Sequence, residues 1–314
     1  MNIYYQLADL PTATVPVVAT IGNFDGVHLG HQGVIAEVIE RARFLGGQSL
    51  AITFDPHPAR VLRPEQPHTL ITPLPRKLEL LAATGIDASL VLPFTDALRH
   101  MHSREFATEI LAGAIHVTEV HEGENFRFGY HAEAGIEGLE SLGRELGFGV
   151  VVYAPRSLRG APVSSSRIRK LIAAGDVSHA RALLGRPFSI DSTPAGGRGY
   201  GAKYAVPTIN LAPYRELLPA HGVYVTTLAI GEETFDAVTN VGNRPTFGSN
   251  SFAVESHLLN FHPIELTEQT PLRLTFLRRL RAEQRFPSTE ALRNQIARDV
   301  TRSRRYFALC RNMA

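Results

Sequence analysis

The stretch Ala19-Thr-Ile-Gly-Asn-Phe-Asp-Gly-Val-His-Leu-Gly-His31 lies between an apolar run, residues 15–21, and an amphipathic segment, residues 32–46. Its order of residue types predicts a β-strand, a glycine-rich turn and an α-helix. Glycines let a backbone turn tightly and approach a ligand closely, and the first turn of a helix offers free N–H groups at the positive end of its dipole. The stretch therefore predicts a phosphate-binding turn made of Gly22, Asn23, Phe24, Asp25, Gly26 and Gly30.

Two histidines stand at the end of this stretch. His28 and His31 are three residues apart, which places them side by side near the first helical turn, where imidazoles can hydrogen-bond phosphate oxygens or a leaving pyrophosphate. The lysine of a Walker motif and the spaced glycines of a dinucleotide-binding fold are both missing. Two plainer interpretations stay open: an ordinary strand-to-helix turn, and one half of a metal site, for which the sequence points to no third ligand nearby.

The composition describes an ordinary globular protein. The 314 residues are enough for two domains, each with its own core, and 44% of them are hydrophobic and 20% charged. A formal net charge of +2 gives no strong reason to expect nucleic acid or a membrane as partner. The sequence shows no signal-peptide pattern and no apolar run approaching about 18 residues, so we expect a cytoplasmic enzyme. The single cysteine, Cys310, excludes an intramolecular disulfide.

The first half of the chain alternates short β-rich runs with helical patterns. Strands are expected at residues 15–21, 49–54, 89–92, 115–120 and 150–153, and helices at residues 32–46, 76–83, 104–111 and 139–146. Such alternation predicts an α/β domain with a doubly wound parallel sheet, which binds ligands beyond the carboxyl ends of its strands. The opening stretch lies at such an end. Another such strand end is followed by Thr53-Phe-Asp-Pro-His-Pro58. Its two prolines fix an extended turn, which we expect to line a nucleotide pocket.

A second motif, Ser164-Ser-Ser-Arg-Ile-Arg169, opens a later helix. Ser164 and Ser165 offer hydroxyl caps together with the N–H groups of a helix start. Arg167 and Arg169 add planar donors that suit phosphate oxygens. A capped helix with solvated arginines is the plain alternative to a second phosphate-binding element.

The alternation of helix and strand stops near Pro187, where we place the domain boundary. Successive strands are expected at residues 206–211, 223–230, 234–241, 252–259 and 272–277, followed by a helix from an N-cap at Ser288 to about residue 309. Strands without intervening helices predict a small antiparallel β-barrel with a C-terminal helix. The expected domains are therefore residues 1–186 and residues 187–314.

The predicted barrel has phosphate chemistry of its own. A glycine-rich loop at residues 196–203 is suited to wrap ATP phosphates, with candidate contacts at Gly197, Gly199, Gly201 and Lys203. This loop runs into Val206-Pro-Thr-Ile-Asn210. In an extended chain Thr208 and Asn210 share one face, and their neutral oxygens suit Mg²⁺ beside ATP phosphates.

Taken together, these motifs resemble the bacterial bifunctional riboflavin kinase/FAD synthetase family over nearly the whole chain. The pattern Gly-x-Phe-Asp-Gly-x-His-x-Gly-His is similar to that of the adenylyl-transferring half and of the wider nucleotidyltransferase superfamily. Gly123-Glu-Asn-Phe-Arg-Phe-Gly129 and the serine-arginine motif, with Ser166 in place of the usual threonine, resemble further motifs of that half. Pro-Thr-Ile-Asn210, the loop Asn240-Val-Gly-Asn-Arg-Pro-Thr246 and a strand glutamate, Glu255, resemble the riboflavin kinase module.

The resemblance implies a two-step flavin enzyme. Residues 187–314 would phosphorylate riboflavin to FMN with ATP and Mg²⁺, and residues 1–186 would join FMN to a second ATP, giving FAD and pyrophosphate. Glu255, expected on one strand face with His257, Leu259 and Phe261, would act as the base of the kinase. The resemblance assigns catalysis of adenylyl transfer to His28, His31 and Arg169, and ligand contacts to Asn125, Asn243, Arg244 and Thr246.

Two other functions stay open. Ala205, where the family usually has glycine, and the departing residues 262–269 leave room for a single-activity FMN adenylyltransferase whose barrel only binds flavin. Arginine-rich stretches at residues 278–285 and 298–305 leave room for an RNA-binding or regulatory protein, although Glu283 and Asp299 interrupt them and no aromatic platform accompanies them. The sequence does not give the oligomeric state.

Overall fold

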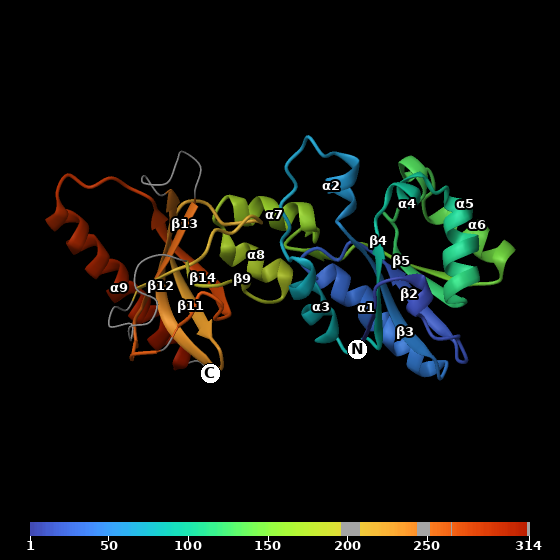
Figure 1. The fold of residues 1–314 in the computed structure, drawn as a ribbon, viewed down its shortest axis with the longest axis horizontal. Helices are drawn as coiled ribbons and strands as arrows, with labels where there is room; N and C mark the ends of the chain where they lie inside the picture. The colour runs from blue at the N-terminus through green and yellow to red at the C-terminus, as the bar shows by residue number, and fades with distance from the viewer. Residues whose placement is uncertain (196–207, 244–251, 265, 313–314) are drawn as a thin grey trace. The chain divides into compact units, whose positions relative to one another are not determined.

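The computed structural model describes residues 1–195, 208–243, 252–264 and 266–312 (Figure 1). Within it the chain divides into two compact units, Met1–Ser165 and Ser166–Ala314. Each unit is built on a six-stranded sheet of its own. No helix in these parts of the chain is long and apolar enough to cross a membrane.

The sheet of the first unit is parallel throughout. Its strands lie in the order β1 (Asn2–Tyr4), β4 (Ala88–Pro93), β3 (Gln48–Asp55), β2 (Val17–Ile21), β5 (Val117–Gly123) and β6 (Gly149–Tyr153). The strand order changes direction between β2 and β5, as in a doubly wound sheet, so the predicted fold class is confirmed for this unit. The edge strand β1 escapes prediction because its three residues are too few to show a period.

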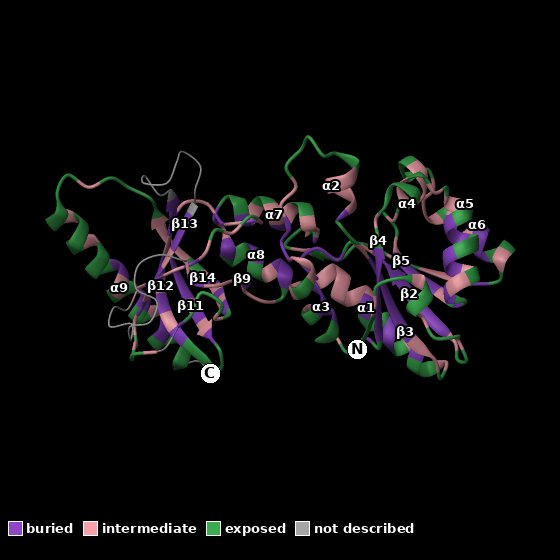
Figure 2. Ribbon diagram, in the orientation of Figure 1, coloured by how far each residue is buried: buried purple, intermediate pink, exposed green. Residues whose placement is uncertain are grey.

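Alternate side chains of the central strands face different helices, and the strands themselves are largely buried (Figure 2). Ala19 and Ile21 of β2 pack with η2 (Phe106–Ile115), a π-helix, and with α6 (Ile136–Leu146). Val18 packs with α1 (Leu29–Phe44), and Ala51 of β3 with α1 and α3 (Leu74–Ala82). This period of two is what a sheet covered on both faces requires.

Short elements complete the first unit, several of them close to the carboxyl edge of its sheet. They are η1 (Leu7–Asp9), α2 (Pro58–Leu62), α4 (Asp96–His100), α5 (Ser103–Glu105), η3 (Tyr130–Ala132), β7 (Ser157–Leu158) and β8 (Ala161–Pro162). α7 (Ser165–Ala173) begins at the last residue of this unit. The glycine-rich turn and the loops after β3, β4 and β5 all lie at this edge, where ligands bind in such sheets.

The second unit has an antiparallel sheet in the order β10 (Thr208–Asn210), β13 (Phe252–Leu258), β12 (Glu233–Asn243), β11 (Gly222–Ile230), β14 (Leu272–Ala282) and β9 (Phe188–Ser192). A bridge between Pro194 and Leu211 joins the chain beyond the two edge strands, so the sheet curls toward a barrel. α8 (Val177–Leu184) packs against β14 and β9, and α9 (Thr289–Arg311) follows the last strand. The predicted antiparallel barrel with its closing helix is confirmed.

The closing helix α9 begins and is anchored by side-chain contacts. The Ser288 hydroxyl accepts the N–H of Ala291 at 3.1 Å, which confirms the predicted N-cap. Asp299, only 2% exposed, accepts from Arg281 Nε at 2.8 Å and from Gln295 Nε2 at 2.9 Å. An ion pair that ties the helix to β14 therefore lies inside the unit.

Other arginines of the second unit also have partners within the fold. Arg279 donates to the carbonyl oxygens of Ala174 at 3.2 Å and His221 at 2.6 Å, and Arg273 Nε lies 2.5 Å from Asp191 Oδ1. Arg279 and Arg281 belong to the arginine-rich stretch 278–285 behind the RNA-binding alternative, and this stretch is thus used in part to hold the unit together.

We expect a fragment of residues 166–314 to be more stable than one of residues 187–314. Only the longer fragment keeps α8, and each large apolar side chain withdrawn from water contributes about 1.5–3 kcal/mol. The buried residues of α8 are Val177, Ala180, Leu183 and Leu184. Thermal unfolding followed by circular dichroism compares the two fragments, and equal midpoints would contradict the role given to α8 in this core.

Candidate active sites

The turn after β2 has an unusual backbone. Gly26 has a φ of 87°, and Phe24 and Val27 have φ values of 44° and 36°. Positive φ is uncommon outside glycine, and rarer still for a β-branched residue, because Cβ crowds the backbone. Such conformations cost about 1–3 kcal/mol each and persist where the surroundings hold them, often at functional sites. Here Phe24 and Val27 are buried in the core cluster that α1 and α3 share.

Asp25 holds this turn to the segment before α3. Its buried carboxylate accepts the N–H groups of Ile71 and Thr72, each at 2.9 Å. The hydroxyl of Thr72 in turn accepts the N–H of Gly26 at 2.9 Å. The carboxylate of Asp25 therefore shapes the turn from within the protein, while its predicted contact with a ligand stays a prediction.

The two histidines lie together where α1 begins. His28 is the N-cap, and its Nδ1 accepts the N–H of His31 at 3.3 Å. Their rings stack with centroids 3.6 Å apart, and the ring of Phe24 meets that of His31 edge-on at 5.2 Å. The sequence expectation that the imidazoles are neighbours agrees with this arrangement, and their chemical role stays a prediction.

The serine motif reaches the same turn. The Ser165 hydroxyl donates to the carbonyl oxygen of Asp25 at 2.7 Å. A Cβ added at Gly30 would lie 3.6 Å from the carbonyl oxygen of Val163, so this segment passes close to the start of α1. Two motifs that are far apart in the sequence thus meet in the first unit. Arg167 and Arg169 follow on α7, in the second unit, and their part in this site stays a prediction.

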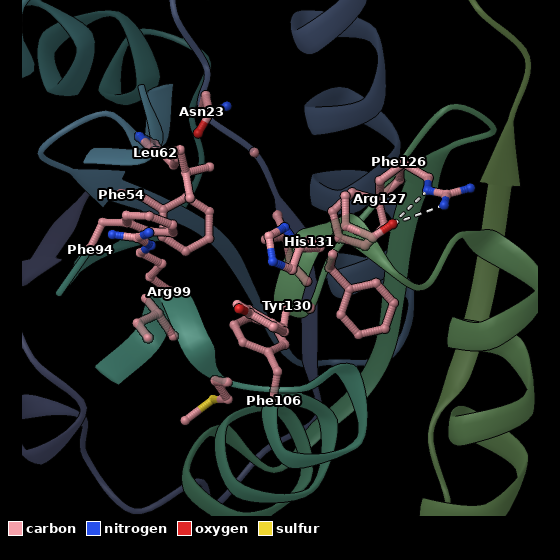
Figure 3. A pocket seen from close by; sticks show the side chains of 18 of the residues that line it. Asn23, Phe54, Leu62, Phe94, Arg99, Phe106, Phe126, Arg127, Tyr130 and His131 are labelled. Atoms are coloured by element: carbon pink, nitrogen blue, oxygen red, sulfur yellow. Dashed lines mark hydrogen bonds between the residues drawn. The ribbon is translucent and has the colours of Figure 1, made fainter. Parts of the chain in front are cut away.

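A cavity of about 690 Å³ opens beside the turn, at the carboxyl edge of the sheet (Figure 3). The turn contributes Gly22 and Asn23 to its lining, and the loop after β5 contributes Asn125. Most of the other lining side chains are aromatic or basic. They include Phe54, Phe94, Phe106, Phe126, Phe128, Tyr130, Arg63, Arg99, Arg127 and His131.

The aromatic walls of this cavity are ordered by contacts between rings. Phe126 and Phe128 stack with centroids 5.4 Å apart, and Phe54 meets Phe94 edge-on at 5.8 Å. Arg127 donates to the carbonyl oxygen of Ala132 at 2.9 Å and so fixes the loop after β5 (Figure 3). The sequence pointed to the loops at residues 53–58 and 123–129 but not to the aromatic cavity, because its rings come from four separate segments.

Glu122 occupies the place where β2 and β5 separate. The two strands pair only as far as Ala19 and Val120. Beyond that point the carboxyl group of Glu122 accepts the N–H of Ile21 and, at 3.3 Å, the hydroxyl of Thr20. Glu122 is only 5% exposed, and burial raises its pKa to about 8 although these hydrogen bonds oppose the shift. A largely protonated side chain therefore replaces the backbone ladder at the point where the sheet reverses its order.

Replacing Glu122 by Gln should change how stability depends on pH. The folded protein binds the Glu122 proton more tightly than the unfolded chain does. The contribution of this proton to the free energy of unfolding is therefore complete below about pH 4.5 and is lost as the pH rises to about 8. Between these two pH values, the free energy of unfolding of the Glu122→Gln variant should rise relative to that of the wild type by up to about 1.4 kcal/mol per pH unit. Urea unfolding of both proteins from pH 5 to pH 8.5 tests this, and parallel pH profiles would show that Glu122 does not titrate abnormally.

The second candidate site lies on the outer face of the curled sheet. Asn210 and Asn240 both pair with Glu255, from the strands on either side of it. Thr208 pairs with His257, and their side chains lie 3.2 Å apart from Oγ1 to Nδ1. Cross-strand partners share a face, and so do residues two apart on one strand. The prediction that Thr208 and Asn210 share a face is therefore confirmed.

A cavity of about 430 Å³ lies between this face and α9. Polar residues of the strands line one side, namely Thr208, Asn240, Glu255 and His257, and the helix contributes Leu292, Ile296, Asp299 and Val300. Burial and the nearby positive charge of Arg304 lower the pKa of His257, which favours the neutral imidazole. The cavity therefore combines charged and neutral polar groups of the strands with apolar side chains of α9.

Some candidate residues of this half do not lie where the sequence predicted them, and others lie outside the described residues. β13 ends at Leu258, so Leu259 and Phe261 do not share a strand face with Glu255; the chain bends after the strand instead. Asn243 is the last residue of β12. The candidates Gly197, Gly199, Gly201, Lys203, Arg244 and Thr246, together with Ala205, lie outside the described residues.

Comparisons with known proteins cover both halves of the chain. A family model described as FAD synthetase matches residues 10–167, and one described as riboflavin kinase matches residues 184–307. The bifunctional riboflavin kinase/FMN adenylyltransferase of Pseudomonas fluorescens is 36% identical over 91% of this chain and 92% of the relative. The protein of the same name from Escherichia coli K12 is 32% identical over 93% of each chain.

A solved structure has the same fold. The crystal structure of a macrolide-efflux protein from Streptococcus pneumoniae matches with a TM-score of 0.84 and 25% identity, over 96% of this chain and 98% of that one. The likeness supports the two-part architecture described above. Because the relatives match over almost their full lengths and both family models are present, this chain belongs to the bifunctional riboflavin kinase/FMN adenylyltransferase family and is an enzyme that makes FMN from riboflavin and FAD from FMN.

Proposed function

We propose that residues 1–186 carry out the adenylyl transfer and residues 187–314 the phosphorylation of riboflavin. Two family models that match successive parts of the chain, residues 10–167 and 184–307, support such a division of labour, as does the presence of a separate cavity in each part. ATP serves both reactions. Riboflavin is the first substrate, FMN the intermediate and FAD the final product. A cytoplasmic location and the lack of a nucleic-acid partner stay predictions.

In the adenylyl transfer, a phosphate oxygen of FMN forms a bond to the α-phosphorus of ATP, and the bond to the β-phosphate breaks with release of pyrophosphate. The nucleophile is already an anion, so the reaction needs alignment and charge neutralisation more than a base. The imidazoles of His28 and His31 and the N–H groups at the start of α1 hydrogen-bond the phosphate oxygens. Ser165 and Arg169 add further donors.

One observation carries this assignment: Gly22 and Asn23 belong both to the phosphate turn and to the lining of the aromatic cavity. Stacked and edge-on phenyl rings suit a planar apolar ligand such as the isoalloxazine ring of a flavin. A flavin ring in this cavity brings its phosphate chain to the turn. Asn125 and Arg127, from the loop after β5, then lie beside the ligand.

In the kinase step, the 5′-hydroxyl oxygen of riboflavin forms a bond to the γ-phosphorus of ATP, the hydroxyl proton moves to Glu255, and ADP leaves. Glu255 suits this role because it lies between Asn210 and Asn240 on a face that borders a cavity with an apolar wall. The apolar wall formed with α9 supplies contact area for the flavin ring. The glycine-rich loop, with Gly197, Gly199, Gly201 and Lys203, wraps the ATP phosphates, and the turn with Asn243, Arg244 and Thr246 contacts the ligand.

Thr208 and Asn210 would hold Mg²⁺ in this half. Hydroxyl and amide oxygens are the hard, neutral ligands that this ion accepts, and both residues lie on one face of β10 beside Glu255. The Thr208 hydroxyl can donate its proton to the neutral imidazole of His257 and keep its lone pairs for a cation. The ion, when bound, neutralises charge on the ATP phosphates.

Replacing both His28 and His31 by alanine should lower FAD formation from supplied FMN by about 10²–10⁴-fold, since each lost charge-assisted contact costs about 1.5–3 kcal/mol. Riboflavin phosphorylation should stay nearly intact because the imidazoles serve only the adenylyl site. Both products are separated and quantified by chromatography. His179→Ala, a histidine of α8, is the matched control, and equal loss of both activities would mean that the pair acts through folding.

Glu255→Gln preserves size but removes the proton acceptor. General-base assistance is worth about 10²–10⁴-fold, so riboflavin phosphorylation should fall on that order while FAD formation from added FMN persists. Glu233→Gln, an exposed glutamate at the start of β12, provides the control. A variant that binds riboflavin and Mg-ATP and still phosphorylates at the wild-type rate would remove Glu255 from the mechanism.

A further inference from the structure

A lysine is buried next to the phosphate turn of the first unit. Lys77 lies in the first turns of α3 and is only 3% exposed. Its Nζ donates to the hydroxyl of Thr53 at 3.1 Å. Across the described chain no carboxylate forms an ion pair with this ammonium group. Lysine is almost never fully buried unless it is paired, because burying a charge without a counter-charge costs free energy.

The hydrogen bond of Lys77 continues to the turn. The Thr53 hydroxyl, which accepts from Lys77, donates its own proton to the carbonyl oxygen of Asn23 at 3.4 Å. A hydroxyl has one proton and two lone pairs, so both bonds can exist at once. Asn23 in turn lines the aromatic cavity. The chain Lys77, Thr53, Asn23 therefore links a buried cation to the residue shared by the turn and the cavity.

Two carboxylates near Lys77 act on its positive charge from a distance rather than by direct contact. Burial lowers the pKa of Lys77, and the carboxylates of Asp25 and Asp55 act against this shift from a distance. The Asp25 carboxylate is occupied by the N–H groups of Ile71 and Thr72. Among the residues that the structure describes, Thr53 is the one hydrogen-bond partner of this ammonium group, which lies in a region of low dielectric, where a charge acts over longer distances than in water.

We propose that Lys77 is a positioning residue for adenylyl transfer: through Thr53 it fixes the backbone of Asn23, and its charge favours the nucleotide polyphosphate at the turn. The proposal assigns no proton transfer to Lys77. The proposal rests on the assignment of adenylyl transfer to the first unit. It explains why a costly buried cation is placed beneath a turn that binds anions.

The test compares three variants of the full-length enzyme. Lys77→Met keeps the length of the side chain without its charge, Thr53→Val removes the linking hydroxyl, and Thr53→Ser retains it. For each, kcat and KM for ATP are measured in FAD formation from FMN, with riboflavin phosphorylation as the internal control. Folding is followed by circular dichroism and urea unfolding.

We expect Lys77→Met to fold and to lower kcat/KM for ATP by about tenfold or more, as the loss of a hydrogen bond to a charged group would. Its stability should not fall, because replacing a poorly paired buried charge by an apolar group is often neutral or stabilising. Thr53→Val should lower the same parameter, and Thr53→Ser should keep more activity than Thr53→Val. Thr53→Val should add little in the Lys77→Met background, since the two residues act in series.

Several outcomes would overturn the proposal. Wild-type FAD formation in a folded Lys77→Met enzyme is one, and equal effects of the two Thr53 variants is another. A loss of stability with a parallel fall of both activities would show that Lys77 only balances the charge of Asp25. If Lys77→Met does not fold, the comparison of Thr53→Val with Thr53→Ser decides. Failure of the site assignment itself appears separately, as FAD formation that survives the loss of His28 and His31.

Discussion

The adenylyl half of this enzyme depends on how the chain is held between β2 and α1. The turn there contains two non-glycine residues with positive φ, Phe24 and Val27, and is unfavourable on its own. Asp25 offsets this cost by accepting N–H groups from a segment 46 residues later, and Ser165 binds its carbonyl oxygen from 140 residues later. Because these partners are distant in sequence, the turn takes this shape only when the whole unit has folded, and contacts within the protein set that shape.

The kinase half depends on strand register in a similar way. On the inner face of the sheet, the hydroxyls of Thr226, Thr239 and Ser256 form a buried row with separations of 2.6 and 2.8 Å. On the outer face of β13 the neighbours of Ser256 are Glu255 and His257, which border the cavity under α9. A slip of one residue would exchange the two faces and bury the carboxylate. Packing inside the sheet and chemistry outside it are therefore fixed by the same pairing.

Features that depend on residues close together in the sequence could be predicted from it, whereas features that depend on the tertiary fold could not. Period-two strands, the helical spacing of α1 and the cap at Ser288 are local, and they are read correctly from the residues. The aromatic cavity gathers rings from four segments, and nothing in one segment reveals the others. Lys77 and Glu122 look like ordinary surface residues in a helix and a strand, because burial depends on the tertiary fold. The short strands β1 and β9 are specified by their neighbours in the sheet rather than by their own pattern.

The N-cap of α1 has a consequence for the chemistry of the imidazole that forms it. His28 Nδ1 accepts the N–H of His31, so that nitrogen carries a lone pair rather than a proton. In the neutral ring the proton must then reside on Nε2, and a single tautomer is selected by the helix backbone. Protonation of Nδ1 would remove the cap and place a cation at the positive end of the helix dipole, which opposes it. The start of the helix thus selects the Nε2–H tautomer of the neutral His28 ring.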